Sequence, residues 1–349
     1  MVQGRVIRTA PSTMWRRPEV KSPLVEGNRY NIMAIDPELI PLLNGVYFAD
    51  LIDIAASRAV VVELSAQSVR ARLAPPDEVD IRDDVATIAS GASVPVRIYQ
   101  PRGATEPLGV LLFLHGGAFV LGNLESEHDR CIDYVRSARC IVVSVDYRLA
   151  PEFAYPAALN DAATTLEWIV SHAELLRADP QRICVGGNSA GGALAAGLAL
   201  RARDEGGPGI AAQLLLYPVL DDRGGTASMT IFKVGNPWDG DRVRRMWALY
   251  LGHEDEVQDY AAPARAHDLA NLPTTFILSC EEDPLRDEDL IFAQRLLLAG
   301  VSVELHHYRG TYHAFDVYGP TTTVGRQALE EQALFLRRTI GASAGLTSR

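Results

Sequence analysis

Short apolar runs alternate with helical patterns through most of this chain. Runs of strand length lie at 110–114, 141–145, 182–185, 213–217, 275–278 and 301–308. Apolar residues recur at helical spacing over 126–138, 157–172, 189–203, 285–299 and 323–340. Strands that alternate with helices of this length form βαβ units, which build a mostly parallel sheet with helices on both faces. We therefore predict an α/β fold, with a further pair of alternating strands at 81–89 and 94–99.

Two parts of the chain do not follow this alternation. Residues 1–30 are polar and aperiodic, and helix signals begin only at Asp36 and again over 49–72. The segment 221–272 is too long for a simple connection between a strand and a helix. It carries its own aromatic residues, Phe232, Trp238, Trp247 and Tyr250. We predict that this segment is an insertion that folds over one end of the sheet.

The composition excludes several classes of protein. A formal net charge of −11 disfavours binding to nucleic acid or to an anionic membrane surface, because both require clustered Lys and Arg. The N-terminus lacks the apolar core of about 7–15 residues found in signal peptides, and no run reaches the roughly 18 apolar residues of a membrane span. Four cysteines lie far apart without a CxxC pair, which favours a reducing compartment. We predict a cytoplasmic protein without a stable membrane anchor.

A serine lies where one predicted strand meets the next helix. Residues 187–191 read GNSAG, which matches the G-x-S-x-G pattern of a nucleophile elbow. In such a turn the hydroxyl of Ser189 projects at the carboxyl end of the sheet. Gly187 and Gly191 are required because a Cβ at either position would meet a neighbouring strand or helix. The pattern is short, and a glycine turn without chemistry is the alternative, so the serine needs partners.

A serine hydroxyl becomes a good nucleophile only when a base removes its proton. In this kind of sheet the acid and the histidine follow the serine in the chain. His313 lies in a loop after the last predicted strand and is our candidate base, whereas His306 and His307 lie within that strand. The candidate acid is Asp283, in the loop after the strand at 275–278. Spacing alone leaves its neighbour, Glu282, as an alternative.

A third requirement is a set of N–H groups for a developing oxyanion. Gly116 and Gly117 follow the strand at 110–114, and Ala190 follows the serine. Their backbone N–H groups are our candidates for the oxyanion hole. His115 precedes the glycines, and we expect it to brace this loop rather than to transfer protons.

These segments together resemble the hormone-sensitive-lipase family of serine esterases, within the α/β-hydrolase superfamily. The resemblance covers about residues 80–340 and rests on HGGAF, DYRLAPE, YPAALND, GNSAGG, DPLRDE and YHAF, in that order. It implies an α/β-hydrolase fold, with Ser189 as nucleophile, Asp283 as acid and His313 as base. It also implies that residues 1–80 and 221–272 form a helical cap over a catalytic domain made of 81–220 and 273–349. The family usually has Asp or Thr at position 188, where this chain has Asn188, and often a third glycine where this chain has Ala118.

The predicted function is hydrolysis of carboxylic esters through an acyl-enzyme, with short to medium acyl groups preferred. The predicted partner is a small-molecule ester, no cofactor or metal is required, and a homodimer is possible because it is common among such enzymes. Phe48, Asn188 and Trp238 are the candidates for substrate contact. The alternatives are amide or lactone hydrolysis, acyl transfer to an alcohol, or a non-catalytic small-molecule receptor on the same scaffold.

Overall fold

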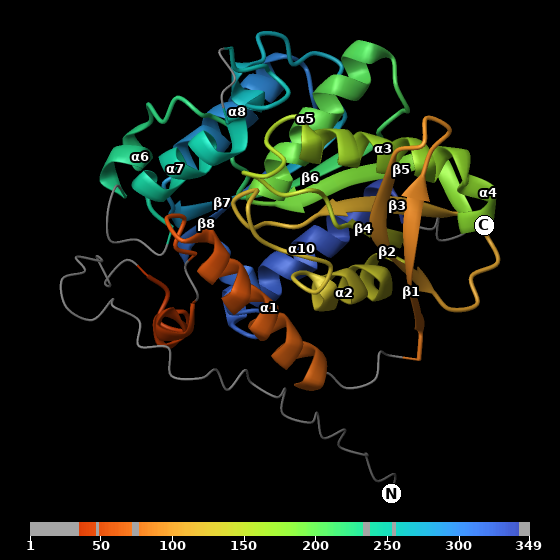
Figure 1. Cartoon of the computed structure of the whole chain (residues 1–349), viewed down its shortest axis with the longest axis horizontal. Coiled ribbons are helices and arrows are strands. Elements are labelled where there is room, and N and C mark those ends of the chain that lie inside the picture. Colours follow the sequence, from red (N-terminus) through yellow and green to blue (C-terminus); the bar gives the residue numbers. More distant parts are fainter. Residues whose placement is uncertain (1–34, 47–48, 72–76, 233–237, 253–255, 342–349) are drawn as a thin grey trace, which may run out of the picture.

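An eight-stranded sheet runs through the computed structural model, which describes residues 35–46, 49–71, 77–232, 238–252 and 256–341 (Figure 1). The strand order is β1-β2-β4-β3-β5-β6-β7-β8. The strands are β1 (Val79–Thr87), β2 (Ser93–Pro101), β3 (Leu108–Leu114), β4 (Ile141–Val145), β5 (Ala178–Asn188), β6 (Ala212–Leu216), β7 (Thr274–Glu282) and β8 (Val303–Tyr312). β2 pairs antiparallel with β1 and with β4, and all other pairs are parallel. The predicted α/β fold is confirmed.

The long helices lie where the sequence predicted them. They are α2 (His128–Ala138), α3 (Ala157–Ser171), α5 (Ala190–Glu205), α8 (Arg286–Leu298) and α10 (Thr323–Thr339), with α1 (Ile54–Ala71) before the sheet. The remaining elements are α4 (Ala173–Leu176), α6 (Ala227–Ile231), α7 (Gly240–Leu251), α9 (Phe315–Tyr318) and the 3-10 segment η3 (Pro263–Arg265). The prediction of an α-helix after Asp36 is wrong, because the chain forms the 3-10 segment η2 (Ile40–Gly45) there. Pro41 and Gly45 leave too few residues between them for an α-helix.

The sheet separates two apolar cores because its central strands are buried on both faces. All seven residues of β3 are buried. Val110, Leu112 and Leu114 pack in one core with α3, α5 and α8. Leu111 and Phe113 point the other way and pack with α2 and α10. In Figure 1 α3 and α5 accordingly lie on one side of the sheet and α2 and α10 on the other.

Between β6 and β7 the chain leaves the sheet and adds α6, α7 and η3. α1 lies near the loop that follows β3, because Nε of Arg58 donates to the carbonyl of Val120 at 2.9 Å. Arg58 also forms an ion pair with Glu152 at 2.7 Å. In the part of the chain that the structure describes, no helix is both long and apolar enough to cross a membrane.

Candidate active site

Ser189 occupies a strained turn between β5 and α5. Its φ is 55° and its ψ −118°, in a region that non-glycine residues rarely adopt. The backbone N–H of Ser189 donates to the carbonyl of Leu216 on β6 at 2.8 Å, which fixes the turn to the sheet. A Cβ on Gly187 or on Gly191 would overlap the carbonyl oxygen of Leu114 on β3. The steric reason for both glycines is therefore as the sequence predicted.

The structure brings Ser189, His313 and Asp283 into one hydrogen-bonded chain. The hydroxyl of Ser189 donates to Nε2 of His313 at 2.9 Å. Nδ1 of His313 donates to Oδ2 of Asp283 at 2.6 Å. Oδ1 of Asp283 accepts from the backbone N–H of Leu285 at 3.0 Å, so both carboxylate oxygens are engaged. Asp283 is fully buried, and Ser189 and His313 are 6% and 9% exposed, so all three side chains are largely shielded from solvent.

The alternative residues lie elsewhere. Glu282 is half-buried at the end of β7, and His313 contacts its neighbour Asp283 instead. His306 forms an ion pair with Glu331 at 2.7 Å. Nδ1 of His307 lies 3.4 Å from the hydroxyl of Ser279. Geometry thus separates the candidates that spacing left open.

The glycine loop after β3 lies beside this chain of residues. Gly117 has a φ of 123°, and its carbonyl accepts from the N–H groups of Val120 and Leu121. Among the described residues, none accepts a hydrogen bond from the N–H groups of Gly116, Gly117 and Ala190. Ala190 is fully buried, whereas Gly116 and Gly117 are partly exposed, and all three N–H groups remain available to bind an acceptor.

His115 braces this loop, as the sequence predicted. Its Nδ1 lies 2.7 Å from the carbonyl of Gly116, and its ring stacks on that of Tyr147 at 4.2 Å. The hydroxyl of Tyr147 in turn donates to the carbonyl of His115 at 2.7 Å. Burial lowers the pKa of His115 to about 4, so the imidazole is neutral at neutral pH and its Nδ1–H donates to Gly116.

Aromatic side chains surround the base. The ring of Trp238 stacks on His313 with centroids 5.7 Å apart, and Tyr217 meets the same imidazole edge-on at 4.9 Å. The indole Nε1 of Trp238 is buried and finds no hydrogen-bond partner among the residues that the structure describes. Further from the serine, Phe119 stacks on Tyr250 of α7 at 3.7 Å. Phe48 lies outside the described residues.

The side chain of Asn188 is buried against Glu127. It is 4% exposed, and its Nδ2 donates to Oε1 of Glu127 at 2.8 Å. The sequence reasoning missed Glu127 and also Tyr217. The only available signal was the position of Tyr217 at the carboxyl end of a predicted strand, next to the elbow.

Comparison with known proteins gives the family. A family profile described as alpha/beta hydrolase fold matches residues 111–317. Esterase LipI of Mycobacterium tuberculosis is 36% identical over 310 residues, which cover 87% of this chain and 95% of the relative. A solved bacterial heroin esterase is 40% identical with a TM-score of 0.85, covering 90% of this chain and 100% of the other. Esterase LipW from Mycobacterium marinum is 41% identical with a TM-score of 0.80, covering 88% and 97%. The chain therefore belongs to the α/β-hydrolase fold family, among the esterases that resemble hormone-sensitive lipase.

Proposed function

We propose that this protein is a serine carboxylesterase. The observation that carries the proposal is the chain of hydrogen bonds from the strained Ser189 through His313 to the buried Asp283. A serine, a histidine and an aspartate in this order form the arrangement that activates a hydroxyl for acyl transfer. The named esterases among the relatives support the same reaction class.

In this mechanism Ser189 attacks the ester carbonyl while Nε2 of His313 takes its proton. Asp283 holds the imidazole in the tautomer that leaves Nε2 free to accept, and it stabilises the imidazolium that forms. The oxyanion accepts hydrogen bonds from the N–H groups of Gly116, Gly117 and Ala190, and each such donor is worth about 3 kcal/mol in the transition state. His313 then protonates the departing alcohol and activates a water that releases the acid.

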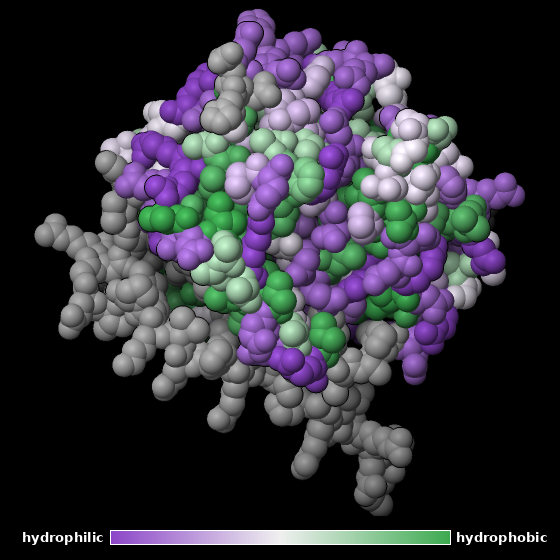
Figure 2. Space-filling model, in the orientation of Figure 1, coloured by the Kyte–Doolittle hydropathy of each residue, from purple (hydrophilic) through white to green (hydrophobic). Residues whose placement is uncertain are grey.

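We propose that residues 1–80 and 221–272 form a cap on a catalytic domain made of 81–220 and 273–349, although 1–34, 47–48, 72–76, 233–237, 253–255 and 342–349 lie outside the described residues. Contacts from both segments support this division. Arg58 on α1 holds the loop after β3 through Val120, and Trp238 stacks on the base. A site whose nucleophile and base are this shielded from solvent limits the acyl chain that can be buried, so we propose short to medium acyl esters as substrates. On the face seen in Figure 2, hydrophobic residues are interrupted by hydrophilic ones, unlike the broad apolar surface of an enzyme that works at an oil–water boundary.

The test is hydrolysis of nitrophenyl esters from acetate to palmitate by the purified protein, with a fluorophosphonate probe to label the nucleophile. We expect the highest kcat/KM on short to medium esters in solution, and labelling of the wild type but not of S189A. Amides, lactones and acceptor alcohols in the same panel distinguish the related acyl-transfer reactions. A labelled S189A, or the highest activity on emulsified palmitate, would contradict the proposal.

We also propose a homodimer formed at the β8 edge of the sheet. β8 is the last strand in the order, and the adjacent α8 exposes Leu297 and Leu298, which are 56% and 82% accessible. Exposed leucines beside an edge strand are a typical subunit contact. Sedimentation velocity checks this, and a monomer at micromolar concentration would contradict it.

We propose the cytoplasm as the location. All four cysteines are buried free thiols, which suits a reducing compartment. Fractionation of the cells that produce the protein, followed by detection with an antibody, tests the proposal, and recovery from the medium would contradict it.

A further inference from the structure

Asn188 lies between two parts of the proposed catalytic machinery. It is the last residue of β5 and precedes Ser189 directly. A Cβ on Gly116 would come within 3.1 Å of Nδ2 of Asn188, so this side chain packs against the proposed oxyanion donor. The orientation of its amide is fixed by Glu127, because a carboxylate oxygen requires a donor and Nδ2 lies 2.8 Å from Oε1. Any movement of Asn188 would therefore reach both the nucleophile and the donor loop.

Glu127 extends this contact into a buried network. Its second oxygen, Oε2, accepts from Nε of Arg130 at 2.8 Å. Nη1 of Arg130 donates to Oδ2 of Asp316 at 3.0 Å and to Gln332 at 3.0 Å. Glu127, Arg130 and Asp316 are all at most 7% exposed. One guanidinium thus joins two carboxylates that are far apart in the sequence.

The far end of the network reaches the base. Asp316 is the second residue of α9 and lies only three residues after His313. Its Oδ1 accepts from the hydroxyl of Tyr217 at 2.8 Å, and the ring of Tyr217 lies edge-on against the imidazole of His313. The nucleophile at one end and the base at the other are therefore supported by the same buried ions.

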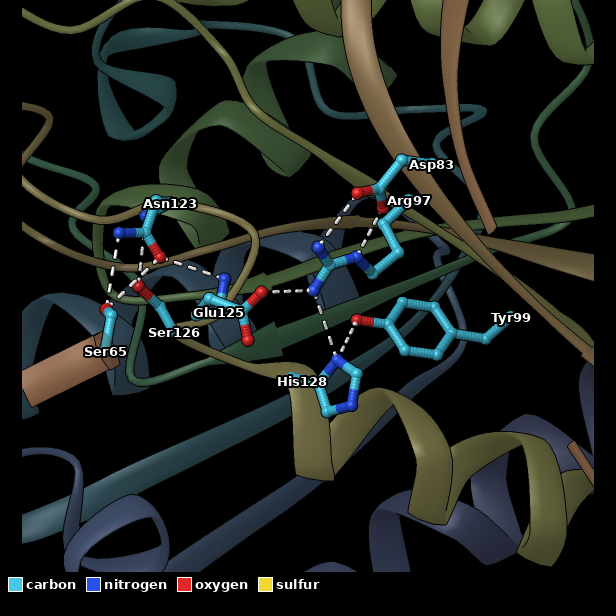
Figure 3. A network of polar contacts seen from close by, with 8 residues as sticks. All are labelled: Ser65, Asp83, Arg97, Tyr99, Asn123, Glu125, Ser126 and His128. Atoms are coloured by element: carbon cyan, nitrogen blue, oxygen red, sulfur yellow. Dashed lines mark hydrogen bonds and ion pairs between the residues drawn. The ribbon is translucent and has the colours of Figure 1, made fainter. Parts of the chain in front are cut away.

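The segment that carries Glu127 is itself held from two sides (Figure 3). Nδ2 of Asn123 donates to the hydroxyl of Ser65 on α1 at 3.3 Å, and Oδ1 of Asn123 accepts from the N–H of Glu125 at 2.9 Å. Nη1 of Arg97 on β2 donates to Oε1 of Glu125 at 2.6 Å. Because the loop is fixed before α2 begins, Glu127 has little freedom to move away from Asn188.

We propose that Asn188 and Glu127 are a matched amide–carboxylate pair that positions Ser189 for the reaction. Through Arg130 the same pair also constrains the loop that carries the base. This inference rests on the proposed esterase function and assigns positioning residues to its site. It also gives a physical reason for Asn188 in a family that usually has Asp or Thr at this position.

The reason is electrostatic. Burial raises the pKa of Glu127, and the charge of Arg130 opposes that effect. Burial would also raise the pKa of Asp316, but Arg130, Gln332 and Tyr217 hold the pKa of this carboxyl below its usual value. A second carboxylate at position 188 would face Glu127 at hydrogen-bond distance, and the two could coexist only by sharing a proton. The other titratable groups around Glu127 are Cys131, Tyr134, Tyr147 and Tyr217.

The test is a double-mutant cycle with N188D, E127Q and N188D/E127Q, measured as kcat/KM on nitrophenyl acetate from pH 5 to 10. N188D should lose about 10- to 100-fold in kcat/KM at pH 8, because the elbow is displaced. Its kcat/KM should also fall further with rising pH, in the range where the proton shared by the two carboxylates dissociates. E127Q should lose activity without that further fall, because Asn188 must then rotate its amide to accept from the new side-chain amide at position 127. Its Nδ2 would take the buried place of Oδ1, which has no hydrogen-bond partner among the described residues. The double variant restores one acceptor and one donor, so it should return to within about threefold of the wild type. The matched control is D129N, which removes an exposed carboxylate from the first turn of the same helix and should leave activity unchanged.

An N188D variant with the activity and pH profile of the wild type would overturn the pairing, as would a double variant worse than both single ones. If N188D does not fold, the comparison of E127Q with N188D/E127Q still decides the question. A double variant more active than E127Q supports the pairing, and one that is no more active contradicts it. Failure of the esterase proposal is distinguishable, because the wild type would then be inactive on esters and indistinguishable from S189A.

Discussion

Replacing Asp283 with Asn is the sharpest single test of the site, because the structure fixes how the new amide must lie. The backbone N–H of Leu285 is 3.0 Å from Oδ1, so that oxygen position must remain an acceptor. The amide NH₂ of an Asn is therefore forced to the position of Oδ2, which lies 2.6 Å from Nδ1 of His313. Two donors would face each other there. The imidazole can relieve this only by moving its proton to Nε2, which then cannot accept the proton of Ser189.

The expected loss is that of a triad with the wrong tautomer, about 10⁴-fold in kcat, which corresponds to about 5.4 kcal/mol of barrier. The loss in kcat is measured in stopped assays on nitrophenyl acetate. The near-ultraviolet circular dichroism of each variant checks that it is folded. The matched control is E282Q, because Glu282 is the adjacent carboxylate, at the last position of β7, and its replacement should lower kcat less than tenfold. A D283N variant that keeps more than about a tenth of the activity, or an E282Q variant that loses as much, would refute this reading.

Three further predictions concern the elbow and the buried acids. S189A and H313A should each lower kcat by several orders of magnitude while the unfolding temperature changes little, and a burst-free residual rate in single-turnover assays checks this. G191A should unfold more easily than the wild type by about 2 kcal/mol or more, because its Cβ would overlap the carbonyl of Leu114; a variant of normal stability in urea titration would contradict the steric argument. Asp289 is fully buried without a hydrogen-bond partner in the described part of the chain, and burial raises its pKa well above the usual value. The folded state then binds a proton that the unfolded state releases, so stability falls as pH rises above about 4, and D289N should become more stable relative to the wild type between pH 5 and pH 8 in thermal unfolding.

Local sequence patterns predicted most of the fold. The alternation of apolar runs with helical spacing predicted a mostly parallel sheet, since a strand buried on both faces, such as β3, needs continuous apolar residues. The same local information predicted the elbow at Ser189, because glycines at 187 and 191 mark a turn where any Cβ would strike β3. It failed after Asp36, where leucines at helical spacing form only a 3-10 turn. Periodicity records which residues are buried, and it does not record whether the chain has room to complete a helix.

The sequence by itself determined the order of serine, acid and histidine and the strand ends that carry them. Only the tertiary structure decided which carboxylate meets His313 and what partners Asn188. The contact between Asn188 and Glu127 joins residues 61 positions apart, and that between Arg130 and Asp316 joins residues 186 apart. Such polar contacts depend on register and on helix placement to within a hydrogen-bond length, whereas a sequence pattern fixes only the face on which a side chain lies. Burial makes these contacts strongly favourable once formed, so the distant residues that complete the site become identifiable only when the chain is folded.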